Sequence, residues 1–168
     1  HVRKKLFMEI VKIGLPQTLG MLILVLTFVS LNKLVGSISE SLMTSWTLCG
    51  RFDQIILMPG MAIGIATITM VGQNYGRQNI QRIKEIYRTN ILLALGSVLL
   101  LTLIYNSFAS LIFRPFSTID AVVQAAVFQV HMVSFSFLGI AVSMVSASTF
   151  QATGHWLPAF LIRITRVV

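Results

Sequence analysis

The sequence predicts an all-α integral membrane protein, a polytopic helical bundle with four full transmembrane helices and the start of a fifth. Of the 168 residues, 55% are hydrophobic and 11% are charged, whereas a soluble domain carries about 25% charged residues. With a mean hydropathy of +0.84, the chain has no polar half that could cover a soluble core. Long apolar segments also recur along it, and a spanning helix needs roughly 20 such residues.

Five apolar segments define the expected helices. They cover residues 13–34, 42–74, 90–113, 121–151 and 157–168. The second and fourth segments are longer than one span requires, so we expect these helices to tilt, kink or project beyond the lipid. The fifth segment stops inside an apolar run, so we expect residues 1–168 to form part of a larger membrane protein.

The second segment contains the most informative stretch of the chain. An apolar run from Ile55 to Val71 has Pro59 and Gly60 near its middle and continues into Gly-Gln-Asn-Tyr-Gly at residues 72–76. Proline removes a backbone hydrogen bond and crowds the preceding turn, so we expect a distortion of this helix at Pro59. Backbone freed inside a membrane must be satisfied by neighbours or line a water-filled cavity, as it does at the substrate sites of transporters.

Ionisable residues inside a membrane are costly and tend to be functional, which makes Arg51 and Asp53 of this segment candidates. Because residues two apart do not share a helix face, these two need not pair with each other. Arg51 belongs to a stripe at three- and four-residue spacing that comprises Thr47, Arg51, Gln54, Met58 and Met61. Two interpretations of the stripe stay open. It is either a cavity wall with a cation, an amide and two adaptable thioethers, or a helix–helix seam from which Arg51 reaches outward.

The distribution of basic residues predicts the orientation of the chain, because Lys and Arg accumulate in cytoplasmic loops. One set flanks the first span and the connection between the second and third: Arg3, Lys4, Lys5, Lys12, Arg77, Arg82, Lys84 and Arg88. We therefore expect a cytoplasmic amino end, cytoplasmic segments at 76–88 and 153–156, and external loops at 35–41 and 114–120. The net charge of +8 then indicates contact with anionic lipid rather than nucleic acid, because no aromatic platform accompanies the basic residues.

Three local predictions complete the helices. Residues 78–88 carry Ile80, Ile83 and Tyr87 between charged residues, which predicts a short interfacial helix that leads into the third span. His131 lies among apolar residues of the fourth segment and is interpreted as a hydrogen-bonded packing residue, with a proton relay as the alternative. Small hydroxyl residues of the same segment allow close approach of helices, and these are Ser134, Ser136, Ser143, Ser146, Ser148 and Thr149.

Motifs of enzymes and metal sites are missing from the sequence. It has no phosphate-binding glycine-rich loop with Lys, no His-Glu-x-x-His and no Gly-x-Ser-x-Gly. The single cysteine, Cys49, supplies neither a disulfide pair nor a metal cluster, and we expect it to be a small packed side chain. We therefore expect no enzyme activity, no resident cofactor and no metal site.

Several stretches resemble the multidrug and toxic compound extrusion (MATE) transporters. Gly-Leu-Pro at residues 14–16 opens the first helix after a basic start. In the second helix, Arg51 is followed by Pro-Gly-Met-Ala-Ile-Gly at 59–64 and by the Gly-Gln-Asn-Tyr-Gly ending at 72–76. The turn after the fourth segment, Phe-Gln-Ala-Thr-Gly-His at 150–155, is similar to the small-residue turn of the family. The resemblance covers nearly the whole chain.

The resemblance implies a secondary active multidrug efflux transporter that works by alternating access of two six-helix lobes, with antiport of H⁺ or Na⁺. This chain resembles the first four to five helices of one lobe, and the form of its 72–76 motif is closer to the carboxy-terminal lobe. The implied partners are the lipid bilayer of the inner membrane, the other lobe, and small organic substrates that are cationic or amphipathic. The candidate substrate-cavity residues from charge and spacing are Arg51, Asp53, Gln54, Met58 and Met61, and Arg51 also matches an arginine common at this point of the family's second helix. The structural motif residues are Pro16, Pro59, Gly60, Gly72, Gln73, Asn74 and Gly76.

Two departures from the family pattern qualify this interpretation. One branch places cation-binding carboxylates in the first and fourth helices, but no Asp or Glu lies within 14–34 or 121–151. The turn after the fourth segment also has Gln151 where many members have Arg. Two alternatives to efflux stay open, namely a lipid-linked oligosaccharide flippase of the same superfamily and a non-transporting membrane subunit. A flippase should have a strongly cationic cavity, and a subunit should have Arg51 and Gln54 in a packed seam.

Overall fold

The computed structural model describes residues 4–165, with side chains except at positions 4–7, 9, 10, 12, 13, 16, 17, 156, 160 and 163–165. Its helices are α1 (Lys4–Ile38), α2 (Glu40–Gly76), α3 (Ile80–Phe113), α4 (Asp120–Val133), α5 (Ser136–Ala152) and α6 (Trp156–Thr165), with a 3₁₀ turn, η1 (Arg114–Phe116), after α3. Within residues 4–165, three helices are long and apolar enough to cross a membrane, and α4 with α5 makes a fourth span if the bent pair is counted as one. This matches the expected membrane bundle, in which α6 is the start of the fifth helix.

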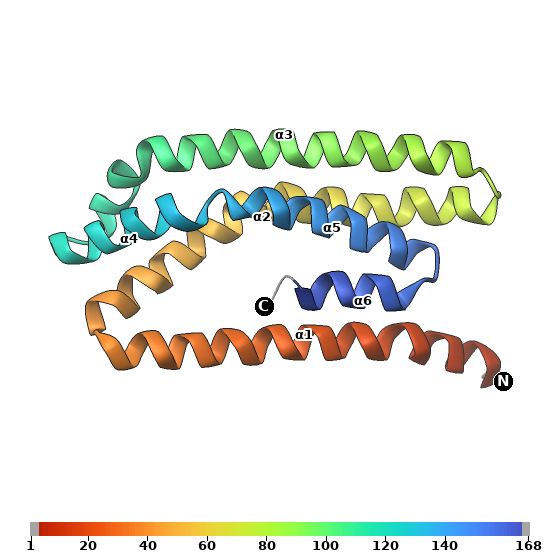
Figure 1. Cartoon of the computed structure of the whole chain (residues 1–168), viewed down its shortest axis with the longest axis horizontal. Helices are drawn as coiled ribbons and strands as arrows, with labels where there is room; N and C mark the ends of the chain where they lie inside the picture. The colour runs from red at the N-terminus through yellow and green to blue at the C-terminus, as the bar shows by residue number, and fades with distance from the viewer. Residues whose placement is uncertain (1–3, 166–168) are drawn as a thin grey trace.

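The helices form a layered bundle (Figure 1) in which α2, α3 and the α4–α5 pair run alongside one another and contact each other. Helix α1 lies at the side of this bundle, next to α6, and contacts α2 near the turn that joins them. A hydrogen bond of 2.7 Å from Trp46 Nε1 to Asn32 Oδ1 links α1 to α2 there. None of the apolar window of α1 is buried within the chain, so its surface is left for lipid or for parts of the protein outside this sequence.

The third helix differs from the sequence prediction. Residues 78–88 do not form a separate interfacial helix or a long loop, because α3 begins at Ile80 and only residues 77–79 connect it to α2. The side chain of Asn79 caps α3 by accepting a hydrogen bond of 3.1 Å from the backbone N–H of Arg82. Ile83 and Ile86 then pack against Val71 of α2 in a small buried cluster, which holds the basic first turns of α3 on the bundle.

The fourth span is one bent unit rather than a continuous helix over 121–151. It breaks at residues 134–135, and α4 and α5 meet there with a bend of 53°. Ser134 anchors the break because its Oγ accepts a hydrogen bond of 2.5 Å from Nδ2 of Asn106 on α3. Of the three expected outcomes (a tilt, a kink or a projection beyond the lipid), the structure shows a kink, and a polar contact across helices accompanies it. Among the other small hydroxyl residues, Ser146 reaches the hydroxyl of Tyr87 at 3.1 Å.

Helix α2 is helical from end to end, yet it changes direction along its length (Figure 1). Its first part runs obliquely and its later part lies parallel to α3. Pro59 lies inside the helix, and the backbone hydrogen bond that it lacks provides a physical reason for this change of direction. The prediction of a distorted but spanning second helix agrees with this course.

Small residues let α2 approach α5 closely. Gly60 and Gly64 are buried, and a Cβ atom built on Gly64 would lie 3.1 Å from Oγ of Ser148. Close approach at small residues favours helix association in membranes, where the hydrophobic effect does not drive it. At the end of α5, Gly154 adopts a φ of +78°, a conformation that suits glycine, and the chain turns there into α6.

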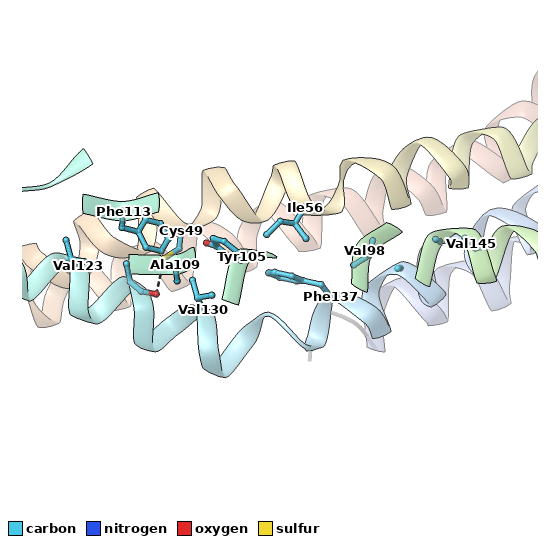
Figure 2. Close-up of a cluster of buried hydrophobic side chains, with 13 residues drawn as sticks. Cys49, Ile56, Val98, Tyr105, Ala109, Phe113, Val123, Val130, Phe137 and Val145 are labelled. Atoms are coloured by element: carbon cyan, nitrogen blue, oxygen red, sulfur yellow. Dashed lines mark hydrogen bonds between the residues drawn. The ribbon is translucent and has the colours of Figure 1, made fainter. Parts of the chain in front are cut away.

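Aromatic and aliphatic side chains from four helices form the main core (Figure 2). Cys49 of α2, Tyr105 and Phe113 of α3, Val130 of α4 and Phe137 of α5 all point into it. Cys49 is fully buried and its Sγ lies 3.7 Å from the carbonyl oxygen of Ala126, so it is a packed side chain as predicted.

Candidate functional site: the uncovered face of α2

Four of the predicted cavity residues share one exposed face of α2. Arg51 and Gln54 are exposed, and Met58 and Met61 have 63% and 52% of their surface exposed. Thr47, which extends the stripe, is exposed as well. The helical repeat places these side chains opposite the buried residues of α2. The structure thus brings the cation, the amide and the two thioethers together as the sequence spacing predicts.

No helix of the described chain packs over this stripe. The seam interpretation requires Arg51 and Gln54 to be packed against a neighbouring helix, and within this chain they are not. The ion pair found among residues 4–165 joins Arg82 and Glu85 at 2.9 Å on the first turns of α3, and Arg51 takes no part in it. The guanidinium of Arg51 is therefore available to a group outside this chain.

Asp53 does not share this face. It is half-buried on the side of α2 that faces α3, where it interacts electrostatically with Tyr105 and Cys49. Its predicted place among the substrate-cavity residues rested on its position along the chain, and the helical repeat separates it from Arg51. Asp53 therefore belongs to the interior of this bundle.

The Gly-Gln-Asn-Tyr-Gly motif forms the end of α2. Gly72 lies near the end of α5, where an added Cβ would be 3.9 Å from the carbonyl oxygen of Ala152. Asn74 donates a hydrogen bond of 2.8 Å to the carbonyl oxygen of Met70, and its own carbonyl oxygen accepts from the backbone N–H of Asn79 at 3.0 Å. Gln73 and Gly76 are exposed, and Gly76 is the last residue of the helix. The motif thus helps to build the short turn into α3.

Two predicted features fall outside the described part of the chain. Pro16 lies within α1, but its side chain is outside the described residues, so its motif role stays a prediction. Of the basic residues at the amino end, Arg3 and the side chains of Lys4, Lys5 and Lys12 also lie outside the described residues.

The structure shows a cavity beside the 3₁₀ turn that the sequence did not predict. It has a volume of about 400 Å³ between α3 and α4, and Arg114, Asp120, Gln124 and His131 contribute polar groups to it. His131 is exposed there, so its interpretation as a hydrogen-bonded packing residue is wrong. The repeat of α4 turns His131 and Asp120 toward the same cavity, and only the packing of α4 on α3 determines which face of α4 is buried.

Comparison with known proteins identifies the family. The MatE family matches residues 16–168, which is nearly the whole chain. The chain belongs to the MatE family. Its structure is similar to a solved structure of the MATE transporter ClbM in complex with Rb⁺, with a TM-score of 0.91 and 30% sequence identity over 98% of this chain. The family, the fold and the apolar spans together make this a multi-pass membrane protein of a transporter family.

Curated relatives give the same family with modest identity. The probable multidrug resistance protein YpnP of Bacillus subtilis (strain 168) is 32% identical over 74 residues, which are 44% of this chain and 17% of YpnP. The probable multidrug resistance protein YoeA of the same organism is 23% identical over 153 residues, which are 90% of this chain and 33% of YoeA. This chain covers 38% of ClbM. It therefore spans about a third of the length of YoeA and of ClbM.

Proposed function

We propose that this chain is part of one lobe of a secondary active multidrug efflux transporter. In the whole protein, this lobe and a second one alternate between inward-open and outward-open arrangements around a substrate held between them. The multidrug resistance names of YpnP and YoeA and the likeness to ClbM support this function. The substrates we propose are small organic molecules that are cationic or amphipathic, and antiport of H⁺ or Na⁺ drives their export.

The uncovered stripe of α2 is the observation that carries this proposal. A cationic group inside a membrane costs at least about 2.5 kcal/mol on insertion scales, so Arg51 requires water or an anionic partner. Neighbouring Met58 and Met61 are exposed and provide an adaptable apolar surface that suits varied substrates. A face with polar anchors beside flexible thioethers fits the wall of a cavity between two lobes better than a surface in contact with lipid.

Arg51 has an electrostatic role in this proposal. Its guanidinium is always charged and is free of ion pairs within the described residues. Across a cavity between lobes it would stabilise a deprotonated carboxylate of the other lobe and so favour release of the coupling ion. We assign the chain to the carboxy-terminal lobe, because its motif at residues 72–76 resembles that lobe of the family.

The proposed location is the inner membrane, with the amino end in the cytoplasm. The exposed basic residues Arg77, Arg82, Lys84 and Arg88 cluster where α2 passes into α3, and such clusters occur on the cytoplasmic side. In the full-length protein, Gln81→Cys should react with an impermeant maleimide only from the cytoplasm, and Ser37→Cys only from outside. The reverse pattern would show that the proposed orientation is inverted.

The test of the proposed function is export of ethidium by the full-length protein in proteoliposomes, driven by an imposed H⁺ or Na⁺ gradient. The wild-type protein should export ethidium with at least one of the two gradients. Arg51→Ala should lose most of this export while it keeps the wild-type melting temperature, and Arg88→Ala at the exposed start of α3 serves as the matched control. Normal export by a well-folded Arg51→Ala variant would contradict the role of the stripe. Absence of export by the wild-type protein with either gradient would contradict the function itself.

A further inference from the structure

We propose that the cavity between α3 and α4 binds the headgroup of a zwitterionic phospholipid with a primary amine, a phosphatidylethanolamine. In this site the lipid phosphate accepts hydrogen bonds from the guanidinium of Arg114, and the lipid ammonium group donates to the carboxylate of Asp120. The site lies between α3 and α4 and not on the uncovered stripe of α2. The proposal therefore does not depend on what the transporter exports.

Polar side chains from two sides converge on this cavity. Ser110 and Arg114 reach it from the end of α3 and the 3₁₀ turn, and Asp120, Gln124 and His131 reach it from α4. No hydrogen bond or ion pair within the described residues involves any of these five side chains. The opposite charges of Arg114 and Asp120 thus stay unpaired although both line the same cavity. Free groups of both signs suit a ligand that itself carries one positive and one negative group.

The turn between α3 and α4 holds the two charged side chains apart. Arg114 and Pro115 belong to the 3₁₀ turn η1, and proline restricts the backbone there. Ser117 Oγ then accepts a hydrogen bond of 3.2 Å from the backbone N–H of Ile119, the residue that precedes α4. Phe113, directly before the turn, is fully buried in the main core. A turn anchored in this way presents its polar groups to a ligand with little further ordering.

The cavity lies at the edge of the membrane. Helix α3 ends and α4 begins at the same end of the bundle (Figure 1), and the apolar span that contains α3 ends at Phe116. Arg114 and Asp120 are exposed on either side of this residue. The layer at the end of a span consists of lipid headgroups, so phosphates and amines are concentrated around the cavity. In the proposed orientation of the chain, these headgroups belong to the outer leaflet.

The length of the cavity favours a whole lipid over a small soluble zwitterion. The helical rise separates Asp120 from His131 by roughly 16 Å along α4. His131 therefore lies deeper than the headgroup, where an ester carbonyl of a glycerophospholipid accepts a hydrogen bond from its imidazole N–H. Phe128 lines the cavity and is 65% exposed, and nearby Met132 is 67% exposed, so acyl chains have an apolar surface to follow. The volume of about 400 Å³ is within the range of ligand sites.

The carboxylate of Asp120 determines which lipid fits. It repels a second negative charge, which disfavours anionic lipids, and the amide oxygen of neighbouring Gln124 adds another acceptor. A primary ammonium group donates hydrogen bonds to both acceptors, whereas the trimethylammonium group of phosphatidylcholine has no N–H to donate. A metal cation fits poorly, because Arg114 repels it and no group of three metal-ligating side chains occurs within the described residues. The cavity is thus complementary to phosphatidylethanolamine.

Native mass spectrometry of the purified full-length protein, with one lipid class added at a time, tests this assignment. The wild-type protein should bind one phosphatidylethanolamine at least about tenfold more tightly than phosphatidylcholine or phosphatidylglycerol, the factor expected of one hydrogen bond to a charged group. Asp120→Asn should remove the preference over phosphatidylcholine. Arg114→Ala should weaken binding of all three lipids, because each has a phosphate. Glu40→Gln and Lys33→Ala change exposed charges near the turn between α1 and α2, and these matched controls should keep the wild-type preference.

Other outcomes would overturn the site. These are equal binding of the three lipids by the wild-type protein, a preference for phosphatidylglycerol, or a preference for phosphatidylethanolamine that persists in Asp120→Asn. Displacement of the lipid by an equal concentration of soluble phosphoethanolamine would overturn the lipid as occupant, because the contacts below the headgroup would then contribute nothing. Gln124→Leu removes an acceptor without altering charge and should reduce the preference, which maintains a test if the charge variants do not fold.

The lipid site and the proposed function can fail separately. If the preference for phosphatidylethanolamine depends on Asp120 but the wild-type protein exports no ethidium with either gradient, the lipid site stands and the proposed function fails. If ethidium is exported but the three lipids bind equally, the proposed function stands and the lipid site fails.

Discussion

The two faces of α2 carry different residues in opposite environments. The inward face holds Asp53 beside Cys49 and approaches α5 through Gly60 and Gly64, all within a packed bundle. The outward face holds Arg51 with an amide and two thioethers, and no described helix covers it. Close packing of this lobe accounts for Cys49, Gly60 and Gly64 on the inward face. It does not account for the outward residues, and this difference is the reason for assigning function to the outward face.

The comparison predicts that a larger side chain on the inward face of α2 destabilises the protein, whereas a larger side chain at an exposed position does not. Gly64→Val should destabilise the protein by about 1–3 kcal/mol, because overpacking would push Ser148 away from its present place. Ala66→Val, an exposed position two residues along the same helix, is the matched control and should change little. The measurement is thermal unfolding of the purified full-length protein. Equal stability of the two variants would show that α2 and α5 are not closely packed in the membrane.

A smaller loss of stability is expected when the buried hydrogen bond that joins α3 to the inward face of α2 is removed. Asn90 is 8% exposed and its Nδ2 donates to Oγ1 of the fully buried Thr67 at 2.8 Å. Asn90→Ala should reduce stability by about 0.6–1.7 kcal/mol, from the average to the largest value found for such bonds between membrane helices. Thr89→Ala changes the exposed neighbouring residue and should have no comparable effect. A stability loss equal in the two variants would show that the hydrogen bond does not link the helices.

The smallest effect on stability is expected on the outward face. Met61→Ala should change the free energy of unfolding by less than about 0.5 kcal/mol, because the side chain is 52% exposed within this lobe. The relative rates of export of cationic dyes of different size should nevertheless change, because the thioether would contact the substrate. Met70→Ala, nearer the end of α2 and 41% exposed, should leave those relative rates unchanged. Unchanged dye selectivity in Met61→Ala would show that Met61 does not contact the substrate and would limit the substrate surface to the other residues of the stripe.

Hydropathy and helical spacing were sufficient to predict the membrane bundle, the long second span and the shared face of Arg51 and Gln54. These properties depend on local periodicity, which the sequence contains directly. The predicted start of the third helix was wrong. Asn79 caps α3, and Ile83 and Ile86 pack on Val71. The segment with the sequence pattern of an interfacial helix is therefore the first part of the span. Such a junction depends on contacts between helices that periodicity does not reveal.

The break in the fourth span could not be located from the sequence, because neither Pro nor Gly marks it. Its position depends on Asn106, which reaches Ser134 from 28 residues away. The spacing of Asp53 from Arg51 already places the two on different faces of α2, but the interaction of Asp53 with Tyr105 depends on the packing of α2 on α3. Long-range polar contacts of this kind determine which ionisable residue is exposed and which is enclosed.

The central claim, that the outward face of α2 lines a water-filled cavity between lobes, is tested most directly by cysteine labelling. Gln54→Cys in the full-length protein should react with a water-soluble maleimide, and excess ethidium should slow this reaction. Cys49 is fully buried and serves as the internal control that stays unlabelled. A Gln54→Cys variant that is labelled only by lipid-soluble reagents, or whose labelling ethidium does not affect, would contradict the account and place this face in contact with lipid.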